Sequence, residues 1–236
     1  MFTVNSLYLK EQLQRLQPQL NTIEVLPVGL DTAFFSRKQP KPDSNFFDIL
    51  FCGRLIKLKG PDIAINIIEA LLKKGYTKVR LRIIGDGPLH DHLDKIIKDK
   101  NLEAQIFLKG ALTQEAIKKE LTEGDVLIMP GIADPKSGQV ETQGLVIQEA
   151  QAMELPVIVS NVGGMKYGLI PDETGFVVQA NSVDAFVNAL EILILDDNLR
   201  EVMGERGKQF VKENFDNEVL TQHLLKLYEQ TINTTI

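Results

Sequence analysis

The sequence predicts an α/β fold: a doubly wound, Rossmann-like parallel sheet with helices on both faces, followed by a helical tail. Between residues 46 and 178, short apolar runs alternate with segments whose apolar residues recur at helical spacing, and short polar turns join them. The run from Asp125 to Met129 is typical of a strand covered on both faces. From Ser182 onward only helical periodicity remains.

A shorter unit precedes this pattern. Phe2 to Val4 favours a strand, Ser6 is a suitable N-cap, and Ile23 to Val28 favours a second strand. The helix expected after Ser6 carries its apolar residues on one face: Leu9, Leu13 and Leu16. The polar stretch from Arg37 to Asn45 contains two prolines and has the composition of a linker. We therefore expect a domain boundary near residue 45.

Turn and cap residues place the elements of the larger unit in order. Strands are expected over residues 46–52, 79–84, 104–108, 125–129, 155–160 and 175–178. Pro61 is suited to the first turn of the helix after the first strand, and another helix is expected to begin at Gly144. The Gly85-Asp86-Gly87-Pro88 sequence predicts a strand-to-helix turn, which explains Asp86 without a catalytic role.

The helical tail contains expected helix caps and breaks. Ser182 and Asp197 are expected helix caps, and Gly204 and Gly207 are expected to interrupt an otherwise long helix. A break is expected at Phe215-Asp216. The last helix, about residues 217–232, has an amphipathic face formed by Val219, Leu220, Leu224, Leu227 and Tyr228. Such a face needs a covering surface, so self-association of the chain stays open.

Composition restricts the partners. A net charge of −6 and a pI near 5.2 argue against a broad basic surface for nucleic acid. Cys52 is the only cysteine, which excludes disulfides within the chain and cysteine-built zinc sites, and a cytoplasmic setting is expected. No apolar run reaches the length of a membrane span, and no signal-peptide pattern opens the chain. Peripheral membrane association stays open.

Two glutamates frame the expected start of one helix. Glu141 lies on the loop before Gly144, and Glu149 lies inside the helix. The N–H groups of Gly144, Leu145 and Val146 would be unsatisfied first-turn donors, and with the helix dipole they suit an anion such as phosphate. Glutamates at this spacing also occur by chance, and a glutamate within a helix is more often a solvated surface residue.

A second polar loop carries positive charge. Arg54 and Lys59 lie in the segment Gly53 to Gly60, directly after the first expected strand of the sheet. Ligands bind at the carboxyl ends of strands in open α/β sheets. The two side chains would suit a diphosphate there, the arginine as a bidentate clamp and the lysine as a point charge. A solvated basic loop is the alternative, and it is the commoner explanation for an isolated pair of surface cations.

Other ligand motifs are absent from the sequence. No dinucleotide fingerprint of closely spaced glycines and no Walker lysine loop is present, so oxidoreductase and P-loop chemistry are not expected. His90 and His92 lie on a charged helical segment without a partner pattern for a metal ion. We expect no metal site.

Taken in chain order, these residues resemble the donor-binding domain of retaining GT-B glycosyltransferases of the family-4 type, the glycosyl transferases group 1. Glu141 and Glu149 fall on the E-x7-E pattern of that family, and Arg54 and Lys59 fall on its G-R-x4-K-G element. The resemblance covers about residues 46–216. It implies the C-terminal half of a GT-B architecture.

The resemblance implies a hexosyltransferase type of enzyme. It would transfer a sugar from a nucleotide-diphosphate donor with retention of configuration, without a bound metal or other cofactor. Arg54 and Lys59 would neutralise the leaving diphosphate, with the N–H groups of residues 144–146 as further donors. Glu149 would accept hydrogen bonds from the ribose hydroxyls, and Glu141 would hold sugar hydroxyls near the reacting carbon. The expected catalytic residues are therefore Glu141, Arg54 and Lys59.

The resemblance also divides the chain. Residues 1–45 are expected to be the end of an N-terminal acceptor domain with its linker, residues 46–216 the nucleotide-sugar-binding domain, and residues 217–236 a helix that packs back on the acceptor domain. Most of that domain, which would bind a glycan or lipid-linked acceptor in polysaccharide or glycolipid biosynthesis, would lie outside this chain. The alternatives are a non-catalytic nucleotide-sugar-binding subunit and an inactive remnant. Val28 and Lys166-Tyr167 depart from the asparagine and proline-glutamate that are common in the family.

Overall fold

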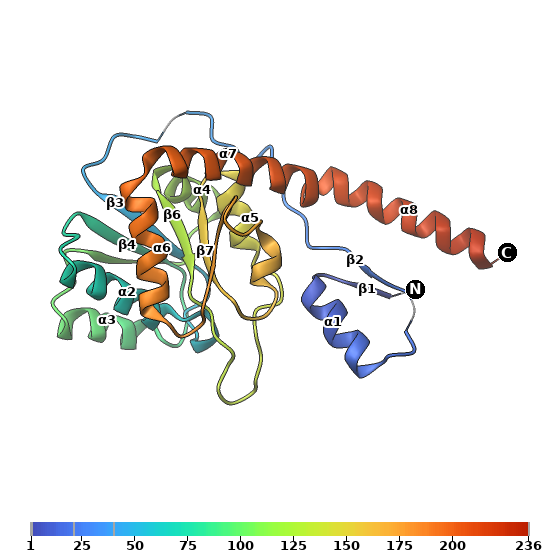
Figure 1. Cartoon of the computed structure of the whole chain (residues 1–236), viewed down its shortest axis with the longest axis horizontal. Coiled ribbons are helices and arrows are strands. Elements are labelled where there is room, and N and C mark those ends of the chain that lie inside the picture. Colours follow the sequence, from blue (N-terminus) through green and yellow to red (C-terminus); the bar gives the residue numbers. More distant parts are fainter. Residues whose placement is uncertain (1, 21, 40, 236) are drawn as a thin grey trace.

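A six-stranded parallel sheet forms the centre of the molecule (Figure 1). The structure is a computed structural model that describes residues 2–20, 22–39 and 41–235, with side chains described up to residue 232. The order across the sheet is β5-β4-β3-β6-β7-β8. The strands are β3 (Phe47–Cys52), β4 (Val79–Ile84), β5 (Ile106–Gly110), β6 (Val126–Met129), β7 (Val157–Ser160) and β8 (Gly175–Val178).

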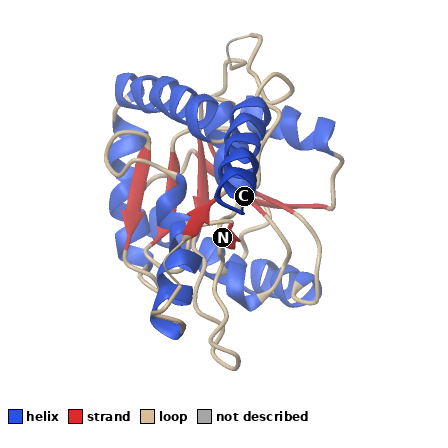
Figure 2. Ribbon diagram, turned by 90° about the vertical axis from the view of Figure 1, so that its right-hand side faces the viewer, coloured by secondary structure: helices blue, strands red, loops and turns tan. Residues whose placement is uncertain are grey.

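Helices cover both faces of this sheet, as the sequence predicts (Figure 2). On one face α2 (Pro61–Lys73), α3 (His90–Asp99) and α6 (Val183–Leu195) pack around a core that includes Ile49 and Phe51. On the other face α4 (Gln114–Glu123), α5 (Leu145–Ala152) and α7 (Asp197–Asn214) pack around Leu50 and Cys52. Successive residues of β3 therefore enter opposite cores, because side chains alternate across a strand.

The strand order has a switch point between β3 and β6. From β3 the chain moves outward through β4 to β5, and it then returns to β6, on the other side of β3, before continuing to β7 and β8. The connections therefore diverge in opposite directions at the carboxyl ends of β3 and β6. In doubly wound sheets this divergence opens a crevice in which ligands bind.

The N-terminal unit is separate from the large sheet (Figure 1). The strands β1 (Phe2–Val4) and β2 (Ile23–Val25) pair in parallel, and α1 (Leu7–Leu16) connects them. Ser6 caps α1 by accepting a hydrogen bond from the Leu9 N–H at 3.3 Å. The strand, cap and helix predicted for this segment are all present.

The helical tail differs from the prediction in two details. Asp196 caps α7 and accepts a hydrogen bond from the Leu199 N–H at 2.9 Å, so Asp197 is the first helical residue and not the cap. The two glycines of α7 do not interrupt the helix. A Cβ at Gly204 would lie 2.2 Å from the Glu154 carbonyl oxygen, so this glycine allows α7 to pack closely on the turn after α5. The break at Phe215-Asp216 is confirmed.

The last helix, α8 (Asn217–Thr235), is partly covered within the chain. Leu220 and Leu227 are buried, and Leu224 is half-buried, so the chain itself covers the leucines of the face that was expected to need a covering surface. Gly29 lies against the start of this helix, since a Cβ on it would be 3.1 Å from the Leu220 side chain, and α8 extends on the same side of the molecule as the N-terminal unit (Figure 1). The exposed apolar residues of α8 are instead Val219, Leu225, Tyr228 and Ile232. Among the described residues, no helix is long and apolar enough to cross a bilayer.

Candidate functional site

The predicted site residues lie at the carboxyl ends of the strands that flank the switch point. The loop after β3 carries Arg54 and Lys59, the chain after β6 leads to Glu141, and α5 begins just beyond it. The residues that the sequence separates by more than 80 positions are thus brought to one edge of the sheet, where Lys59 and Glu141 form an ion pair.

The loop after β3 is held against the end of β6. Its last residues form a short 3-10 helix, Lys57–Lys59, which ends at Gly60 in the left-handed region (φ +67°). A Cβ at Gly60 would lie 2.1 Å from the Pro130 carbonyl oxygen, so only glycine permits this approach. The Ile132 N–H donates to the Leu58 carbonyl at 2.9 Å. The position of Lys59 is therefore fixed by backbone contacts across the switch point.

The glycine turn after β4 supports the same loop from the other side. The Leu55 N–H donates to the Asp86 carbonyl at 2.9 Å. A Cβ at Gly85 would lie 2.0 Å from the Gly53 carbonyl oxygen. The Asp86 side chain accepts a hydrogen bond from the Gly87 N–H next to it, at 2.7 Å. The prediction of a structural turn for Asp86 is confirmed.

The two predicted cations differ in their surroundings. The Arg54 side chain is exposed and, among the described residues, no acceptor or carboxylate meets it. Lys59 runs its methylene stem along Gly53, where a Cβ would contact it at 3.7 Å, and its ammonium group pairs with Glu141. Both partners of this pair retain 17% side-chain exposure. An ammonium has three donors, so Lys59 keeps capacity for a ligand.

Glu141 is ionised and held by several donors. One carboxylate oxygen accepts from the Thr142 N–H at 3.1 Å and, more weakly, from the Gln143 N–H at 3.5 Å, and the other faces Lys59. Burial by itself would raise the pKa of Glu141, but the hydrogen bond and charge of Lys59, with the two backbone donors, outweigh it and lower the pKa. Glu141 is thus available only as an acceptor at neutral pH.

The glycine pair after β7 fixes the backbone that carries Glu141. The Gly164 N–H donates to the Glu141 carbonyl at 2.7 Å. A Cβ at Gly163 would lie 2.2 Å from the same carbonyl oxygen, and one at Gly164 would lie 1.8 Å from the Thr142 carbonyl oxygen. Two chain segments therefore touch backbone to backbone here, which any side chain would prevent.

The N-terminus of α5 presents free donors beside this loop. The first helical residue is Leu145, and Gly144, predicted as the first residue of the helix, is its N-cap with φ +80°. In the described part of the chain, no acceptor meets the N–H groups of Gly144, Leu145 or Val146. Unsatisfied first-turn donors and the helix dipole together attract negative charge. This feature of the prediction has the expected geometry.

Glu149 lies half-buried inside α5, and no described residue meets its carboxylate with a hydrogen bond or an ion pair. Burial raises the pKa of this carboxyl group. Burial, with the nearby charge of Glu149, also raises the pKa of the Cys52 thiol to about 12, while Lys59 opposes the shift. Glu149 is therefore a half-buried acceptor without a donor among the described residues.

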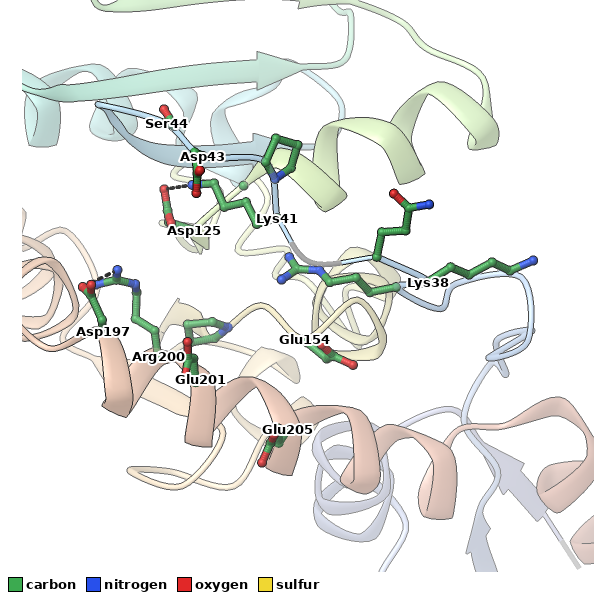
Figure 3. Close-up of a pocket in the computed structure, with 15 residues that line it drawn as sticks. Lys38, Lys41, Asp43, Ser44, Asp125, Glu154, Asp197, Arg200, Glu201 and Glu205 are labelled. Carbon is green, nitrogen blue, oxygen red and sulfur yellow. Dashed lines mark hydrogen bonds and ion pairs between the residues drawn. The ribbon is translucent and has the colours of Figure 1, made fainter.

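The largest hollow among those described lies elsewhere. A cavity of about 670 Å³ opens at the amino ends of β6 and β7, between the linker and α7 (Figure 3). Its charged side chains include ion pairs, such as Lys41 with Asp125 and Arg200 with Asp197. None of Arg54, Lys59, Glu141 and Glu149 lines it. We place the site at the other edge of the sheet, because the free donors and the switch point lie there.

Sequence reasoning missed two features of the site. It assigned Lys59 and Glu141 to different parts of a ligand and did not anticipate that they pair with each other. It also overlooked Gln143, whose buried side chain binds the backbone of Val28. A polar residue between the glutamate and the helix start was the available signal. Among the described residues, no cluster of three or more His, Cys, Asp or Glu could hold a metal ion.

Known proteins resemble this chain in sequence and in fold. The family model for "Glycosyl transferases group 1" matches residues 33–210. The chain is 29% identical over 219 residues to the capsular polysaccharide biosynthesis glycosyltransferase CapM of Staphylococcus aureus, covering 88% of this chain and 52% of CapM. The fold is similar to that of sucrose-phosphate synthase from Thermosynechococcus elongatus, with a TM-score of 0.84, 22% identity, and coverage of 98% of this chain and 58% of that one.

A further similar structure is that of HepE from Anabaena in complex with UDP-glucose. The TM-score is 0.77 at 18% identity, with 97% of this chain and 63% of HepE covered. The chain thus spans about half to two thirds of the length of these proteins.

Proposed function

This chain belongs to the glycosyl transferases group 1 family as a C-terminal type of GT-B domain, and we propose that it binds a nucleotide-diphosphate sugar for retaining glycosyl transfer. One observation carries the proposal: the cations Arg54 and Lys59 and the free donors of the α5 N-terminus lie at one edge of the sheet, at its switch point. The UDP-glucose complex of HepE supports the same ligand class.

The diphosphate would lie between the loop after β3 and α5. Arg54 has no partner in the described structure, so its guanidinium is free to clamp phosphate oxygens bidentately. Lys59 would donate to phosphate while it keeps Glu141, because its ammonium has three N–H groups. The N–H groups of residues 144–146 would complete the anion site.

Glu149 would receive the ribose hydroxyls. Its carboxylate is half-buried and lacks a donor among the described residues, which costs free energy. Two hydroxyl donors would satisfy it and would lower its pKa when the ligand binds. This environment distinguishes Glu149 from a solvated helix residue.

Glu141 would hold hydroxyls of the transferred sugar. Its carboxylate is already oriented by Lys59 and by the backbone, so a sugar hydroxyl would meet a fixed acceptor. Fixed orientation lowers the entropic cost of bringing the reacting carbon to one position. Lys59 would link the sugar contact to the diphosphate contact.

In the reaction, the bond between the anomeric carbon and the diphosphate oxygen breaks, and negative charge develops on that oxygen. Arg54, Lys59 and the α5 donors would stabilise this charge, since they are in place before the reaction begins. The acceptor hydroxyl would form the new bond on the same face and pass its proton to the departing diphosphate oxygen, giving retention and a free nucleoside diphosphate. We assign the acceptor, a glycan or lipid-linked glycan, to a domain outside this chain, which spans about half of CapM.

The names of relatives suggest the setting. CapM is named for capsular polysaccharide biosynthesis, and we extend a role in polysaccharide or glycolipid assembly to the protein that contains this chain. We propose a cytoplasmic location, at the membrane surface where the acceptor is lipid-linked.

Calorimetry with UDP, GDP, ADP and their sugars tests the function. We expect one nucleotide class to bind, and Arg54→Ala and Lys59→Ala each to weaken diphosphate binding by about 1.5–3 kcal/mol while leaving the nucleoside alone nearly unaffected. Lys57→Ala, on the same loop, is the matched control. Unchanged diphosphate affinity in both variants would refute the assignment. Binding without transfer by the two-domain protein would instead favour a non-catalytic binding subunit.

A further inference from the structure

Gln143 connects the loop from Glu141 to Gly144 with the Val28 segment, residues 26–30, which precedes the linker. Its side chain is buried, with 6% exposure, and its amide makes two hydrogen bonds to one residue 115 positions away. The Val28 N–H donates to Gln143 Oε1 at 2.9 Å, and Gln143 Nε2 donates to the Val28 carbonyl at 2.9 Å. The amide thus pairs with the Val28 backbone as a neighbouring strand would.

The backbone of Gln143 is equally engaged with the site. Its N–H and that of Thr142 face one carboxylate oxygen of Glu141, and the next residue, Gly144, is the N-cap of α5. Any displacement of Gln143 therefore shifts both the Glu141 carboxylate and the free donors of the helix. The hydrogen bonds of the Gln143 side chain therefore help to position both the Glu141 carboxylate and the start of α5.

The Val28 segment is a meeting point of other parts of the chain. The Leu26 N–H donates to the Val4 carbonyl at 2.8 Å, which ties the segment to β1. The Leu30 N–H donates to the Phe215 carbonyl at 2.8 Å, and the Asn217 N–H donates to the Leu30 carbonyl at 3.0 Å. The N-terminal unit and the junction of α7 with α8 therefore both attach here. The Val28 side chain is exposed, and the Val28 backbone is held by the Gln143 amide.

We propose, on the basis of the proposed function, that Gln143 is a positioning residue that couples the loop from Glu141 to Gly144 with the Val28 segment. Binding of a diphosphate engages the α5 donors and Lys59, which is paired with Glu141, and so fixes the loop from Glu141 to Gly144. The Gln143 amide passes this constraint to Val28. Such coupling is reciprocal, so the position of the Val28 segment also sets the affinity of the site for the diphosphate. Donor binding and the placement of the acceptor side become one event.

Amide hydrogen exchange on the full chain, with and without UDP, GDP and ADP, tests the coupling. Gln143→Met removes both hydrogen bonds at similar volume. Gln151→Met is the matched control. Gln151 lies on α5 and is buried like Gln143, but its amide donates to the Gly168 carbonyl at 2.7 Å. In the parent and in Gln151→Met, the nucleotide that binds should slow exchange at Val28 roughly tenfold. In Gln143→Met, protection should appear at residues 54–60 but not at Val28.

Equal protection of Val28 in Gln143→Met, or nucleotide binding to the parent without any response at Val28, would overturn the coupling. Failure of every nucleotide to protect residues 54–60 in the parent would refute the proposed function instead. In that case, hydrogen exchange of the two variants without nucleotide tests the coupling. Gln143→Met must accelerate exchange at both Val28 and Ile147, whose N–H donates to the Gly144 carbonyl at 2.9 Å, relative to Gln151→Met, by roughly tenfold. Acceleration at Val28 alone would mean a merely structural tie.

Discussion

Gly164→Ala should displace the loop that carries Glu141 without unfolding the chain. The backbone at Gly164 has φ −90°, which alanine adopts without strain, so any effect arises from the added Cβ. That atom would lie 1.8 Å from the Thr142 carbonyl oxygen, whereas real Cβ contacts are essentially never shorter than 3.0 Å. The loop or the glycine turn must therefore move by 3.0 − 1.8 = 1.2 Å.

A shift of this size removes a hydrogen bond. A ligand hydroxyl about 2.8 Å from Glu141 would become separated by roughly 4 Å, beyond hydrogen-bonding distance. Losing one hydrogen bond to a charged group costs about 1.5–3 kcal/mol, which corresponds to roughly 10–150-fold in affinity. We expect the loss to be larger for the nucleotide sugar than for the nucleoside diphosphate, because Glu141 is proposed to contact the sugar.

Calorimetry with both ligands measures this difference, and thermal unfolding shows whether the variant folds. Gly138→Ala is the control, because Gly138 has φ +69° on the chain leading to Glu141 but nothing lies within 4 Å of its Cβ. It should be strained without displacing Glu141. Parental affinity of Gly164→Ala for the nucleotide sugar would refute the steric reasoning.

The remaining predictions concern the two glutamates and the whole reaction. Glu141→Gln should weaken binding of the nucleotide sugar more than that of the nucleotide, and equal losses in calorimetry would contradict its sugar contact. Glu149→Gln should weaken nucleotide binding yet raise the melting temperature at pH 7. Burial raises the pKa of Glu149, so its ionisation destabilises the folded state above that pKa, and the penalty disappears as pH falls through it. The stability gain of Glu149→Gln should therefore shrink at about pH 5, and a melting temperature at or below that of the parent at pH 7 would count against a buried carboxylate. The chain alone should transfer no sugar from radiolabelled donor, because the reacting carbon needs both walls of a closed, water-poor cleft, and adding an acceptor-domain half should restore turnover. Robust transfer by the purified chain alone would disprove the division into halves.

Local sequence determined the elements and the fold class. Strand and helix periods, the cap at Ser6 and the break at Phe215-Asp216 all depend on residues within a few positions of one another, so the sequence displays them directly. The same is true of the free donors at the start of α5, since the first turn of any helix leaves N–H groups unpaired. Arg54 and Glu149 were likewise identifiable from their places at a strand end and in a helix.

The contacts between distant segments were decided only by the tertiary structure. Gly204 resembles a helix breaker in the sequence, but in the structure its lack of a side chain allows the Glu154 carbonyl to approach α7. Leu227 belongs to an apolar face that the sequence leaves uncovered, but the fold buries it. The pairing of Lys59 with Glu141 depends on β3 lying beside β6. The pairing of Gln143 with Val28 depends on residues 26–30 lying beside the loop before α5. Strand order and backbone contacts are set by the packing of the whole chain. A backbone carbonyl oxygen is the same acceptor in every residue, so the sequence does not indicate which donor it meets. The sequence alone could therefore point to the residues of the proposed ligand site but not to the contacts that hold them in place.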